Sequence, residues 1–418
     1  MLKNFFFATR RLAIAAIVLA LPVVAQTTPA QAVSDRPFVD SGTRLGPSDP
    51  GGADIFGSNV AIEGDLAVVG AADADDFLGA AYVFEREKGV WIERAKLVAS
   101  DRNISSEFGE NTKISGKTIA IGAPGDRNGI GAVYIFEKTG KAWTEQAKVT
   151  ANDPMEFTFF ADSIALSQDV LVSGADLGFV PGVGFPGAAY VFRRIGKSWT
   201  QEAKLIASDA VDGAGFGSGT AVVSGNTIAI GAAAAQRSGV VYIFNRQGGV
   251  WSEQFQLVPS SPEEEQKFGI DLGSSANALV VGAYSAATSG GVRTGAAYVF
   301  RRAGAAWEEE ARLVPSETTV RFFGVRVGIS GSTIVAGAPF TDDFTNPDGG
   351  SAWVFQRSGN TWAMKAKLKA PDATARDNFG GYVAVDGTTI LVGAEQADSS
   401  PTVSDNEGAA YVFDLNGN

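Results

Sequence analysis

The 418-residue sequence contains no cysteine and no histidine. Without cysteine it has no disulfide framework, no thiolate nucleophile and no zinc or iron–sulfur centre held by cysteine. Without histidine it has no Ser-His-Asp triad and lacks the commonest general base and transition-metal ligand. Any catalysis would therefore depend on carboxylates, lysine, arginine, tyrosine and hydroxyl groups.

Basic residues are also scarce. The chain has 34 Lys and Arg against 46 Asp and Glu, which gives a formal net charge of −12. This balance argues against nucleic acid and anionic membrane surfaces as partners. No segment after the N-terminal region approaches the roughly 18 apolar residues of a spanning helix. We therefore expect a protein or glycan partner, with no nucleic acid and no membrane insertion after export.

The N-terminal residues 1–32 predict a secretory signal peptide. A basic leader, an apolar run and an A-x-A cleavage site follow one another at Lys3–Arg11, Leu12–Val24 and Ala30–Ala32. This order is typical of export signals, and the apolar run is short for a membrane-spanning helix. An uncleaved anchor is the alternative. We expect residues 33–418 to form one domain, secreted to the periplasm or the extracellular medium.

An internal repeat dominates the remaining sequence. A box that begins with Gly and ends in Phe recurs at 79–84, 131–136, 187–192, 239–244, 295–300, 350–355 and 408–413. A Phe-Gly pair precedes the box at Phe56, Phe108, Phe216, Phe268, Phe323 and Phe379, with Phe160-Ala161 as a variant. A tryptophan follows it at Trp91, Trp143, Trp199, Trp251, Trp307 and Trp362. Seven in-phase copies indicate a repeat architecture.

Each repeat reads as four short strands. In the first repeat we place them at 57–62, 66–70, 80–86 and 91–97, with alternating polar residues only in the last. Seven four-stranded units predict an all-β fold, a seven-bladed β-propeller. The tryptophans are expected to be packing anchors between neighbouring blades.

The two ends of the chain predict how the ring closes. The seventh repeat stops at its third strand, near Phe413, and has no tryptophan strand. The orphan segment Val39–Leu45 aligns with the fourth strand Trp91–Leu97 of the first repeat. We therefore expect the N-terminal strand to complete blade seven.

The Phe-Gly pairs, the Gly-Ala steps and the Tyr-Val-Phe boxes resemble the FG-GAP repeats of the integrin α-chain head. The resemblance covers residues 39–414 and implies a propeller used for binding or cell adhesion. Many FG-GAP repeats resemble calcium binders, with an acidic loop between the first two strands. Here that place holds only short turns such as Glu63-Gly64-Asp65, too few oxygens for Ca²⁺. We predict no metal site and no cofactor, although the resemblance keeps calcium open.

The loops between the second and third strands differ most between repeats, and variable loops on a rigid scaffold commonly bind ligands. Acidic residues concentrate in the loops of blades six, seven, one and two, which become neighbours in a closed ring. We predict an acidic arc that faces a cation or a basic partner; a merely solvated acidic surface is the alternative. Its residues are Asp73, Asp75, Asp76, Asp126, Asp342, Asp343, Asp348, Asp398, Asp405 and Glu407.

A second recurring acid follows the fourth strand. Asp49, Asp101, Asp153 and Asp209 occupy equivalent places in successive repeats. Because aspartate readily caps its own turn, we expect a structural use there.

Three functions compete on these observations. The first is a secreted, non-catalytic binding or adhesion module that presents its variable loops to a partner. The second is a structural part of a cell-surface assembly. The third is a polysaccharide-processing enzyme with two carboxylates, for which Asp162 and Asp271 form the pair to test. We find no catalytic motif and expect the first.

Overall fold

The structure is a computed structural model that describes residues 42–288, 290–304, 306–341, 349–374, 376–398 and 406–415. These residues belong to the compact unit that spans residues 36–418. The expected signal peptide, residues 1–32, lies outside the described residues.

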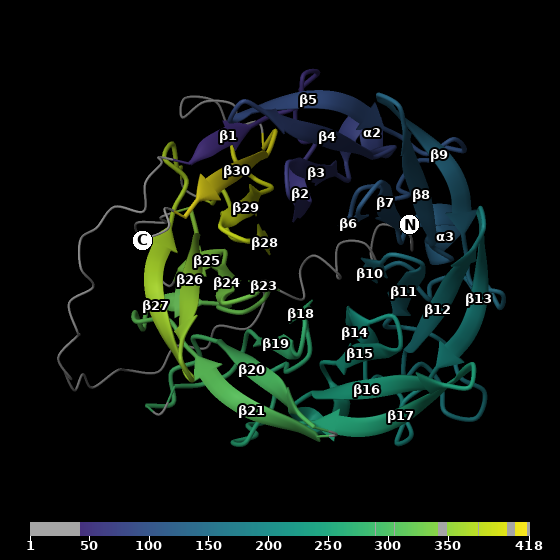
Figure 1. Cartoon of the computed structure of the whole chain (residues 1–418), viewed down its shortest axis with the longest axis vertical. Helices are drawn as coiled ribbons and strands as arrows, with labels where there is room; N and C mark the ends of the chain where they lie inside the picture. The colour runs from purple at the N-terminus through teal and green to yellow at the C-terminus, as the bar shows by residue number, and fades with distance from the viewer. Residues whose placement is uncertain are drawn as a thin grey trace, which may run out of the picture. The chain divides into compact units, whose positions relative to one another are not determined.

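Seven four-stranded antiparallel sheets surround a common axis in the described part of the chain, and they form a β-propeller (Figure 1). Blade one consists of β2 (Phe56–Glu63), β3 (Leu66–Ala71), β4 (Ala80–Glu87) and β5 (Val90–Leu97). In each blade the first strand lies innermost and the strands follow one another outward (Figure 1). The predicted fold and the four predicted strands of the first repeat are confirmed.

The other blades repeat this order. Blade two contains β6 (Asn111–Ser115), β7 (Thr118–Ala123), β8 (Ala132–Thr139) and β9 (Ala142–Val149). Blade three contains β10 (Ser163–Ser167), β11 (Val170–Ala175), β12 (Ala188–Ile195) and β13 (Ser198–Leu205). Blade four contains β14 (Phe216–Ser224), β15 (Thr227–Ala232), β16 (Val240–Gln247) and β17 (Val250–Leu257).

Blade five contains β18 (Leu272–Ser275), β19 (Ala278–Ala283), β20 (Ala296–Ala303) and β21 (Ala306–Leu313). Blade six contains β23 (Val327–Ser330), β24 (Thr333–Ala338), β26 (Ser351–Ser358) and β27 (Thr361–Leu368). Blade seven contains β28 (Tyr382–Asp386), β29 (Thr389–Ala394), β30 (Ala409–Asp414) and β1 (Thr43–Leu45). The connections hold α2 (Ala74–Phe77), α3 (Asp126–Gly129), η1 (Ala235–Arg237) and the short pair β22 (Val320–Arg321) and β25 (Phe340–Thr341).

The N-terminal strand closes the ring. β1 pairs antiparallel with β30, with Thr43 opposite Val412 and Leu45 opposite Ala410. This pairing places the first described strand at the outer edge of the last blade, as the alignment of the repeats predicted. The ring is therefore fastened by strand hydrogen bonds between segments from the two ends of the chain.

The hydrophobic core lies between the blades. Each of seven apolar clusters combines residues of two consecutive blades, and the cluster at the seam contains Tyr82 of blade one with Leu391 and Val412 of blade seven. Because both faces of a middle strand are covered, strands such as β3 read as continuous apolar runs. One blade alone would leave both of its apolar faces in water, so the repeats stabilise one another.

The first glycine of each box allows the blades to approach closely. Gly79 has φ +75°, and a Cβ placed there would lie 2.3 Å from the carbonyl oxygen of Phe108 in the next blade. The ring of that phenylalanine packs within its own blade against Tyr134, with ring centroids 5.3 Å apart in an edge-to-face arrangement. The box and the Phe-Gly pair are thus two sides of one contact between neighbouring repeats.

The tryptophans of the fourth strands link neighbouring blades. The indole N–H of Trp251 donates to Glu202 of the preceding blade at 3.0 Å, and that of Trp362 donates to Glu310 at 3.1 Å. Trp251 also belongs to the apolar cluster between blades three and four. The predicted anchoring role between blades is confirmed for these residues.

Candidate functional site

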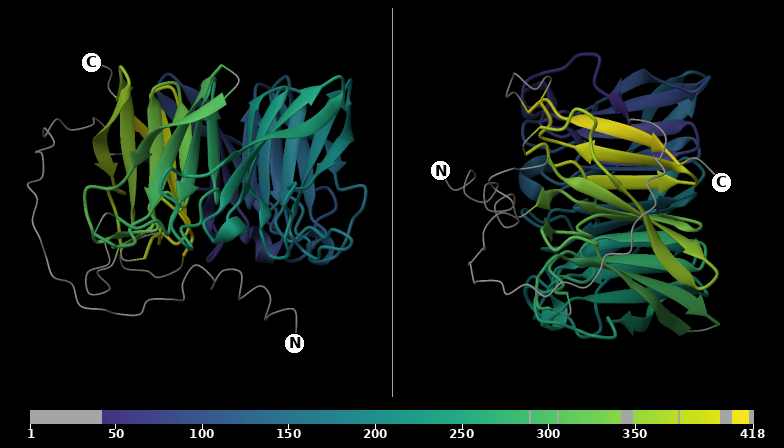
Figure 2. Two further views of the ribbon diagram at one scale, coloured as in Figure 1. Left: turned by 90° about the horizontal axis from the view of Figure 1, so that it is seen from below. Right: turned by 90° about the vertical axis from the view of Figure 1, so that its left-hand side faces the viewer.

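The two faces of the ring differ in the length of their connections (Figure 2). The face with the two-residue turns between first and second strands, such as Gly64-Asp65, is called the turn face here. The opposite face carries the longer loops between second and third strands and the connections from blade to blade, and is called the loop face. On it the backbone N–H of Ser105, which leads into blade two, donates to the carbonyl of Phe77 at 2.8 Å.

The loop face has a repeated backbone frame. In six of the seven blades, the residues one and three positions before the leading phenylalanine adopt left-handed conformations, with φ between +50° and +73°. These pairs are Ala53 and Ile55, Ser105 and Glu107, Phe157 and Phe159, Gly213 and Gly215, Glu265 and Lys267, and Arg376 and Asn378. A left-handed conformation costs a non-glycine residue about 1–2 kcal/mol. The backbone conformation at these two positions is thus the same in these six blades, while the side chains differ. Blade four has glycine at both positions.

Eight exposed apolar side chains of the described residues lie in loops and connections of the loop face: Val258 and Val314 follow the fourth strands of blades four and five, and the other six lie before them in the chain. We call these other six the apolar loop set: Phe77, Ile104, Met155, Phe157, Phe185 and Val211, of which 54, 72, 43, 43, 42 and 55% is exposed. They come from loops that touch, since Phe77 pairs with the connection to blade two and the carbonyl of Phe185 accepts from Gly213 at 3.1 Å. This set was not predicted from the sequence, although large apolar residues within polar loops were a visible signal.

Asp75 of the predicted acidic arc is held by two cations. Its carboxylate accepts a hydrogen bond from the Lys96 ammonium at 2.8 Å and another from the Arg102 guanidinium. Burial alone would raise the pKa of Asp75, but the hydrogen bonds from these two cations lower it below its ordinary value. This carboxylate therefore connects α2 to the outer strand β5 and to the next connection.

Asp126 lies beneath the surface. Its side chain is 1% exposed, forms an ion pair with the Lys148 ammonium at 2.7 Å and accepts a hydrogen bond from the Asn103 amide at 2.6 Å. The carboxylate fixes the start of α3 to the outer strand β9. Asp75 and Asp126 thus share one structural pattern in blades one and two.

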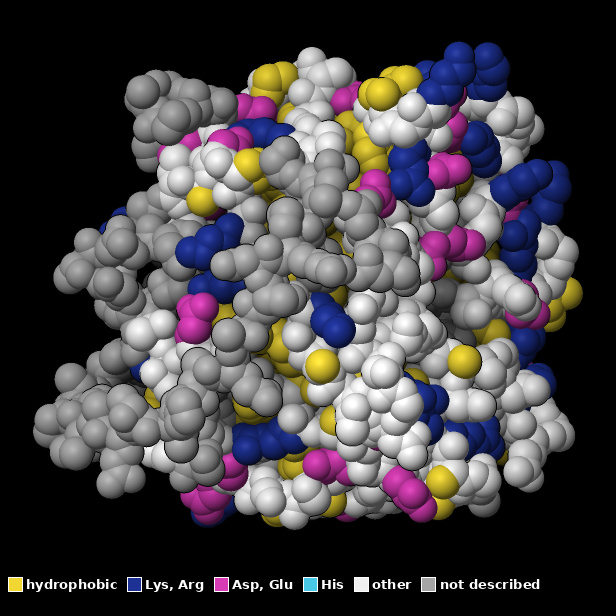
Figure 3. All heavy atoms as spheres, turned by 60° about the vertical axis from the view of Figure 1, so that its left-hand side comes forward, with side chains coloured by type: hydrophobic (Ala, Val, Ile, Leu, Met, Phe, Trp, Pro, Cys, Tyr) yellow, Lys and Arg dark blue, Asp and Glu magenta, His cyan; other side chains and the backbone are white. Residues whose placement is uncertain are grey.

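The other members of the arc fall into two groups. Asp73 and Asp76 flank or belong to α2, whereas Asp398 and Glu407 lie in the loop of blade seven, where Asp398 accepts from the Asn406 N–H at 3.1 Å. Asp342, Asp343, Asp348 and Asp405 lie outside the described residues. On the side of the molecule in Figure 3, acidic and basic side chains lie interspersed over the described surface. The arc as a binding surface stays a prediction.

The recurring acid after the fourth strand has the structural use that we expected, through a different contact. Asp49 accepts from the Tyr82 hydroxyl at 2.9 Å and from the Lys96 ammonium at 2.7 Å. Asp101 repeats both contacts in the next blade, with Tyr134 at 2.7 Å and Lys148 at 2.8 Å. In each of these two blades the aspartate therefore joins the buried tyrosine of the box to the lysine of the outer strand.

Charged residues also gather where the inner strands begin, around the axial channel. The Asp271 carboxylate accepts from the Val327 N–H of the next blade at 2.7 Å, and burial raises the pKa of Asp271. Arg326 lies over the ring of Tyr382 at 4.7 Å, and the Tyr382 hydroxyl donates to Glu110 at 3.2 Å. This network connects blades five and six, and blades seven and two, around the axis.

The proposed catalytic pair lies in the same region. Asp162 precedes β10, and its backbone carbonyl accepts from the Asn111 amide at 3.0 Å. Asp271 precedes β18 and bonds to backbone of blade six. Both residues thus contribute to contacts between blades, and a carboxylate-based reaction stays a prediction.

Metal binding has no support in the described ranges. Within them, no group of three or more acidic side chains is arranged to hold a metal ion. The turns between first and second strands, where the resemblance would place calcium, are two residues long in all seven blades. The absence of a cofactor stays a prediction.

Comparisons with known proteins agree with the fold. The model of the FG-GAP repeat matches seven times, at 41–84, 91–136, 143–192, 199–244, 251–300, 307–355 and 362–413. No curated protein matches the sequence. A chain from the crystal structure of the mitotic checkpoint complex is 15% identical with a TM-score of 0.55, and the match covers 94% of this chain and 100% of that one. At this identity the similarity shows the fold alone.

Proposed function

This chain belongs to the FG-GAP repeat family, and from that premise we propose that it is an exported, non-catalytic binding module whose loop face holds a protein or glycan partner. The observation that carries the proposal is the apolar loop set. Exposed apolar side chains that gather within polar surroundings are typical of interaction sites. The family match itself supports a binding or structural module.

The backbone conformations of two loops also support the loop face as the binding surface. Phe77 has φ +69° and Phe157 has φ +64°, values that are unusual for a bulky residue. Backbone hydrogen bonds hold these loops, since the Phe77 carbonyl accepts from the Ser105 N–H at 2.8 Å and the Phe157 N–H donates to the Asn128 carbonyl at 3.1 Å. An exposed aromatic side chain on a backbone held in an unusual conformation is typical of functional surfaces.

Exposed apolar residues on the turn face are distributed differently. Val90, Ile195 and Val250 are 61, 68 and 68% exposed, and each lies at the hairpin of a separate blade. Single exposed apolar residues are ordinary on protein surfaces. They provide matched control positions of similar chemistry on the opposite face.

Export is the second part of the proposal. The N-terminal pattern of a basic leader, apolar run and A-x-A site supports it, and FG-GAP repeats typically lie outside the cell. Among the described residues, no helix has the length and apolar character needed to cross a bilayer.

The test is photo-crosslinking from both faces in the producing cells. A photoreactive amino acid replaces Phe77 or Ile104 on the loop face, and Val90 or Ile195 on the turn face. We expect the two loop-face positions to yield the same crosslinked partner, while the turn-face positions yield none. The same partner from both faces would instead favour a structural part of an assembly. No crosslink from the loop face, together with no signal on a glycan array, would refute the proposal.

A further inference from the structure

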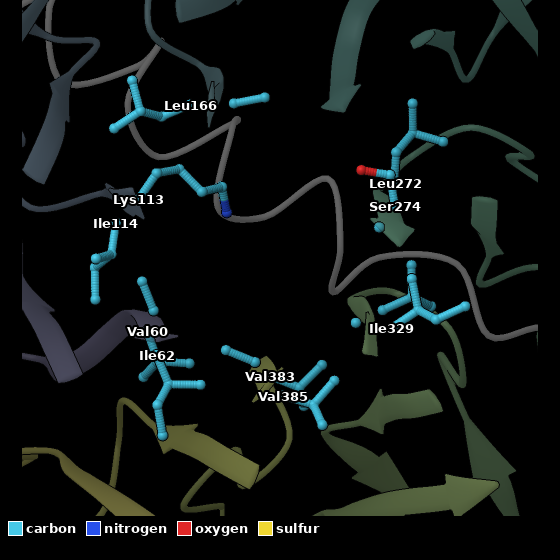
Figure 4. A pocket seen from close by; sticks show the side chains of 16 residues that line it. Val60, Ile62, Lys113, Ile114, Leu166, Leu272, Ser274, Ile329, Val383 and Val385 are labelled. Atoms are coloured by element: carbon cyan, nitrogen blue, oxygen red, sulfur yellow. The ribbon is translucent and has the colours of Figure 1, made fainter. Parts of the chain in front are cut away.

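The axial channel contains a side chain that departs from the repeat. Residues of six inner strands, β2, β6, β10, β18, β23 and β28, line a cavity of about 220 Å³ on the axis (Figure 4). The side chains around it are aliphatic except for Ser274 and Lys113, and Lys113 is the one charged residue among those that line it. Figure 4 shows its ammonium reaching into the open space.

The repeat makes this lysine conspicuous. Lys113 lies five positions after the leading Phe108, and the equivalent residues in blades one, three, five, six and seven are Ala61, Ala165, Gly273, Gly328 and Ala384. Small residues at this position leave the axis open, and one blade sends a long cation into the space. Neither packing between blades nor the pairing of β6 with β7 requires that exception, because five other blades form the same contacts without it.

The Lys113 ammonium has no hydrogen-bond or ion-pair partner among the described residues, although its charge interacts with those of Asp271 and Arg326. Each of those neighbours is already bonded. Asp271 accepts from the Val327 N–H, and Arg326 donates to the carbonyl of Val325 at 3.1 Å. Burial, more than the charge of Arg326, lowers the pKa of Lys113. The Asp271 carboxylate opposes this shift through its charge, but it makes no direct contact with the ammonium, which is left without a hydrogen-bond acceptor among the described residues.

The channel wall offers further donors. Each inner strand is the edge strand of its sheet, and an edge strand presents backbone N–H and C=O groups that have no strand partner. Some of these N–H groups are satisfied by side chains of the preceding blade, as Val327 is by Asp271. An ammonium in a channel whose wall also presents backbone N–H groups is complementary to an anion with several acceptor oxygens.

We propose that the axial channel binds a small oxyanion, a carboxylate or an inorganic phosphate or sulfate, on the ammonium of Lys113. The size of the cavity suits a small ion with accompanying water. The charge of Arg326 adds attraction from the loop-face end of the channel. A bound oxyanion supplies the hydrogen bonds and the directly contacting negative charge that Lys113 lacks. This inference is independent of the loop face and its partner.

The test compares three versions of the full chain: wild type, Lys113→Met and Lys365→Met. Methionine keeps the length of the side chain without its charge, and Lys365, exposed on the outer strand β27, provides the control for loss of one positive charge. Acetate, phosphate and sulfate are titrated separately against a chloride reference of equal ionic strength, and the thermal midpoint is recorded. Exclusion of sulfate and phosphate from the surface raises the midpoint of every version alike.

We expect at least one oxyanion to give wild type and Lys365→Met an additional, saturating rise that Lys113→Met lacks. The anion that produces this rise shows whether the site prefers a carboxylate or an inorganic phosphate or sulfate. Equal responses of all three versions to every anion would overturn the proposal.

A second measurement observes the amine directly. Lysines are dimethylated reductively with ¹³C, and the resonance missing from Lys113→Met is assigned to Lys113. We expect it to titrate at lower pH than the exposed lysines, and to move to higher pH when the anion binds, because a bound anion favours the charged form. A Lys113 resonance that titrates unchanged with and without each anion would contradict binding at this site.

Discussion

The close contact at the box glycine gives the sharpest prediction about stability. We expect Gly79→Ala to destabilise the ring far more than Gly64→Ala, although both glycines have positive φ, +75° and +58°. A Cβ on Gly79 would lie 2.3 Å from the Phe108 carbonyl oxygen, whereas nothing lies within 4 Å of a Cβ on Gly64. Blade five already holds Ala276 in the equivalent turn, with φ +49°.

The expected magnitudes follow from these two environments. Left-handed conformation costs either alanine about 1–2 kcal/mol. The contact at Gly79 is with backbone, so blades one and two must separate locally, and overpacking of that kind adds about 1–3 kcal/mol. We therefore expect a loss of about 2–5 kcal/mol for Gly79→Ala against about 1–2 kcal/mol for Gly64→Ala.

Urea unfolding followed by tryptophan fluorescence measures both variants. An unchanged m-value with a lower midpoint assigns the loss to the folded state. Equal losses for the two variants would refute the reasoning, because they would show that the contact between blades tolerates a side chain and that backbone strain alone matters.

Four further predictions test the fold and the charge networks. Phe108→Ala should cost about 3–5 kcal/mol in urea unfolding, because its ring is fully buried; a loss below that of an exposed phenylalanine would contradict the packing. Asp386→Ala should cost about 1 kcal/mol, because its carboxylate accepts from the Gly64 N–H at 2.7 Å across the seam; an unchanged midpoint would show that this contact does not stabilise closure. Burial raises the pKa of Glu310, but hydrogen bonds from Arg357 and Trp362 lower it below its ordinary value. The ionised carboxylate therefore contributes its full stability above the ordinary pKa of about 4.3, and this contribution is lost as the pH falls through the lowered pKa. The difference in unfolding free energy between wild type and Glu310→Gln should shrink over that range, and a difference that stays constant would contradict the expectation. Residues 33–418 should have the same melting temperature in calcium and in chelator, and a clear rise in calcium would contradict the predicted loss of the family's metal sites.

The repeat made the fold predictable. The Phe-Gly pairs, the boxes and the tryptophans specify contacts within a blade or with the next one, so their spacing determines four strands per unit and seven units per ring. The unpaired segment 39–45 predicted closure for the same reason, and β1 confirms it against β30. Because each repeat contacts only its neighbours, the residues that form these contacts recur with the short period of the repeat.

The side chains at the candidate sites were not predictable in the same way. Counting carboxylates could not show that Lys148 pairs with the buried Asp126, because Asp126 lies in a loop and Lys148 on the outer strand of the same blade. The exposure of Phe77 depends on how its loop is held by the connection to blade two.

Lys113 needs both the sequence and the tertiary structure to be understood. The sequence shows that it stands where the equivalent residues of other repeats are alanine or glycine. Only the closed ring brings the inner strands of six blades around one axis, and so decides that this lysine reaches into a shared channel. The sequence by itself determined the repeating contacts, since each lies within one period of the chain. The tertiary structure decided which side chains meet across the axis and on the loop face, because those neighbours come from many repeats at once.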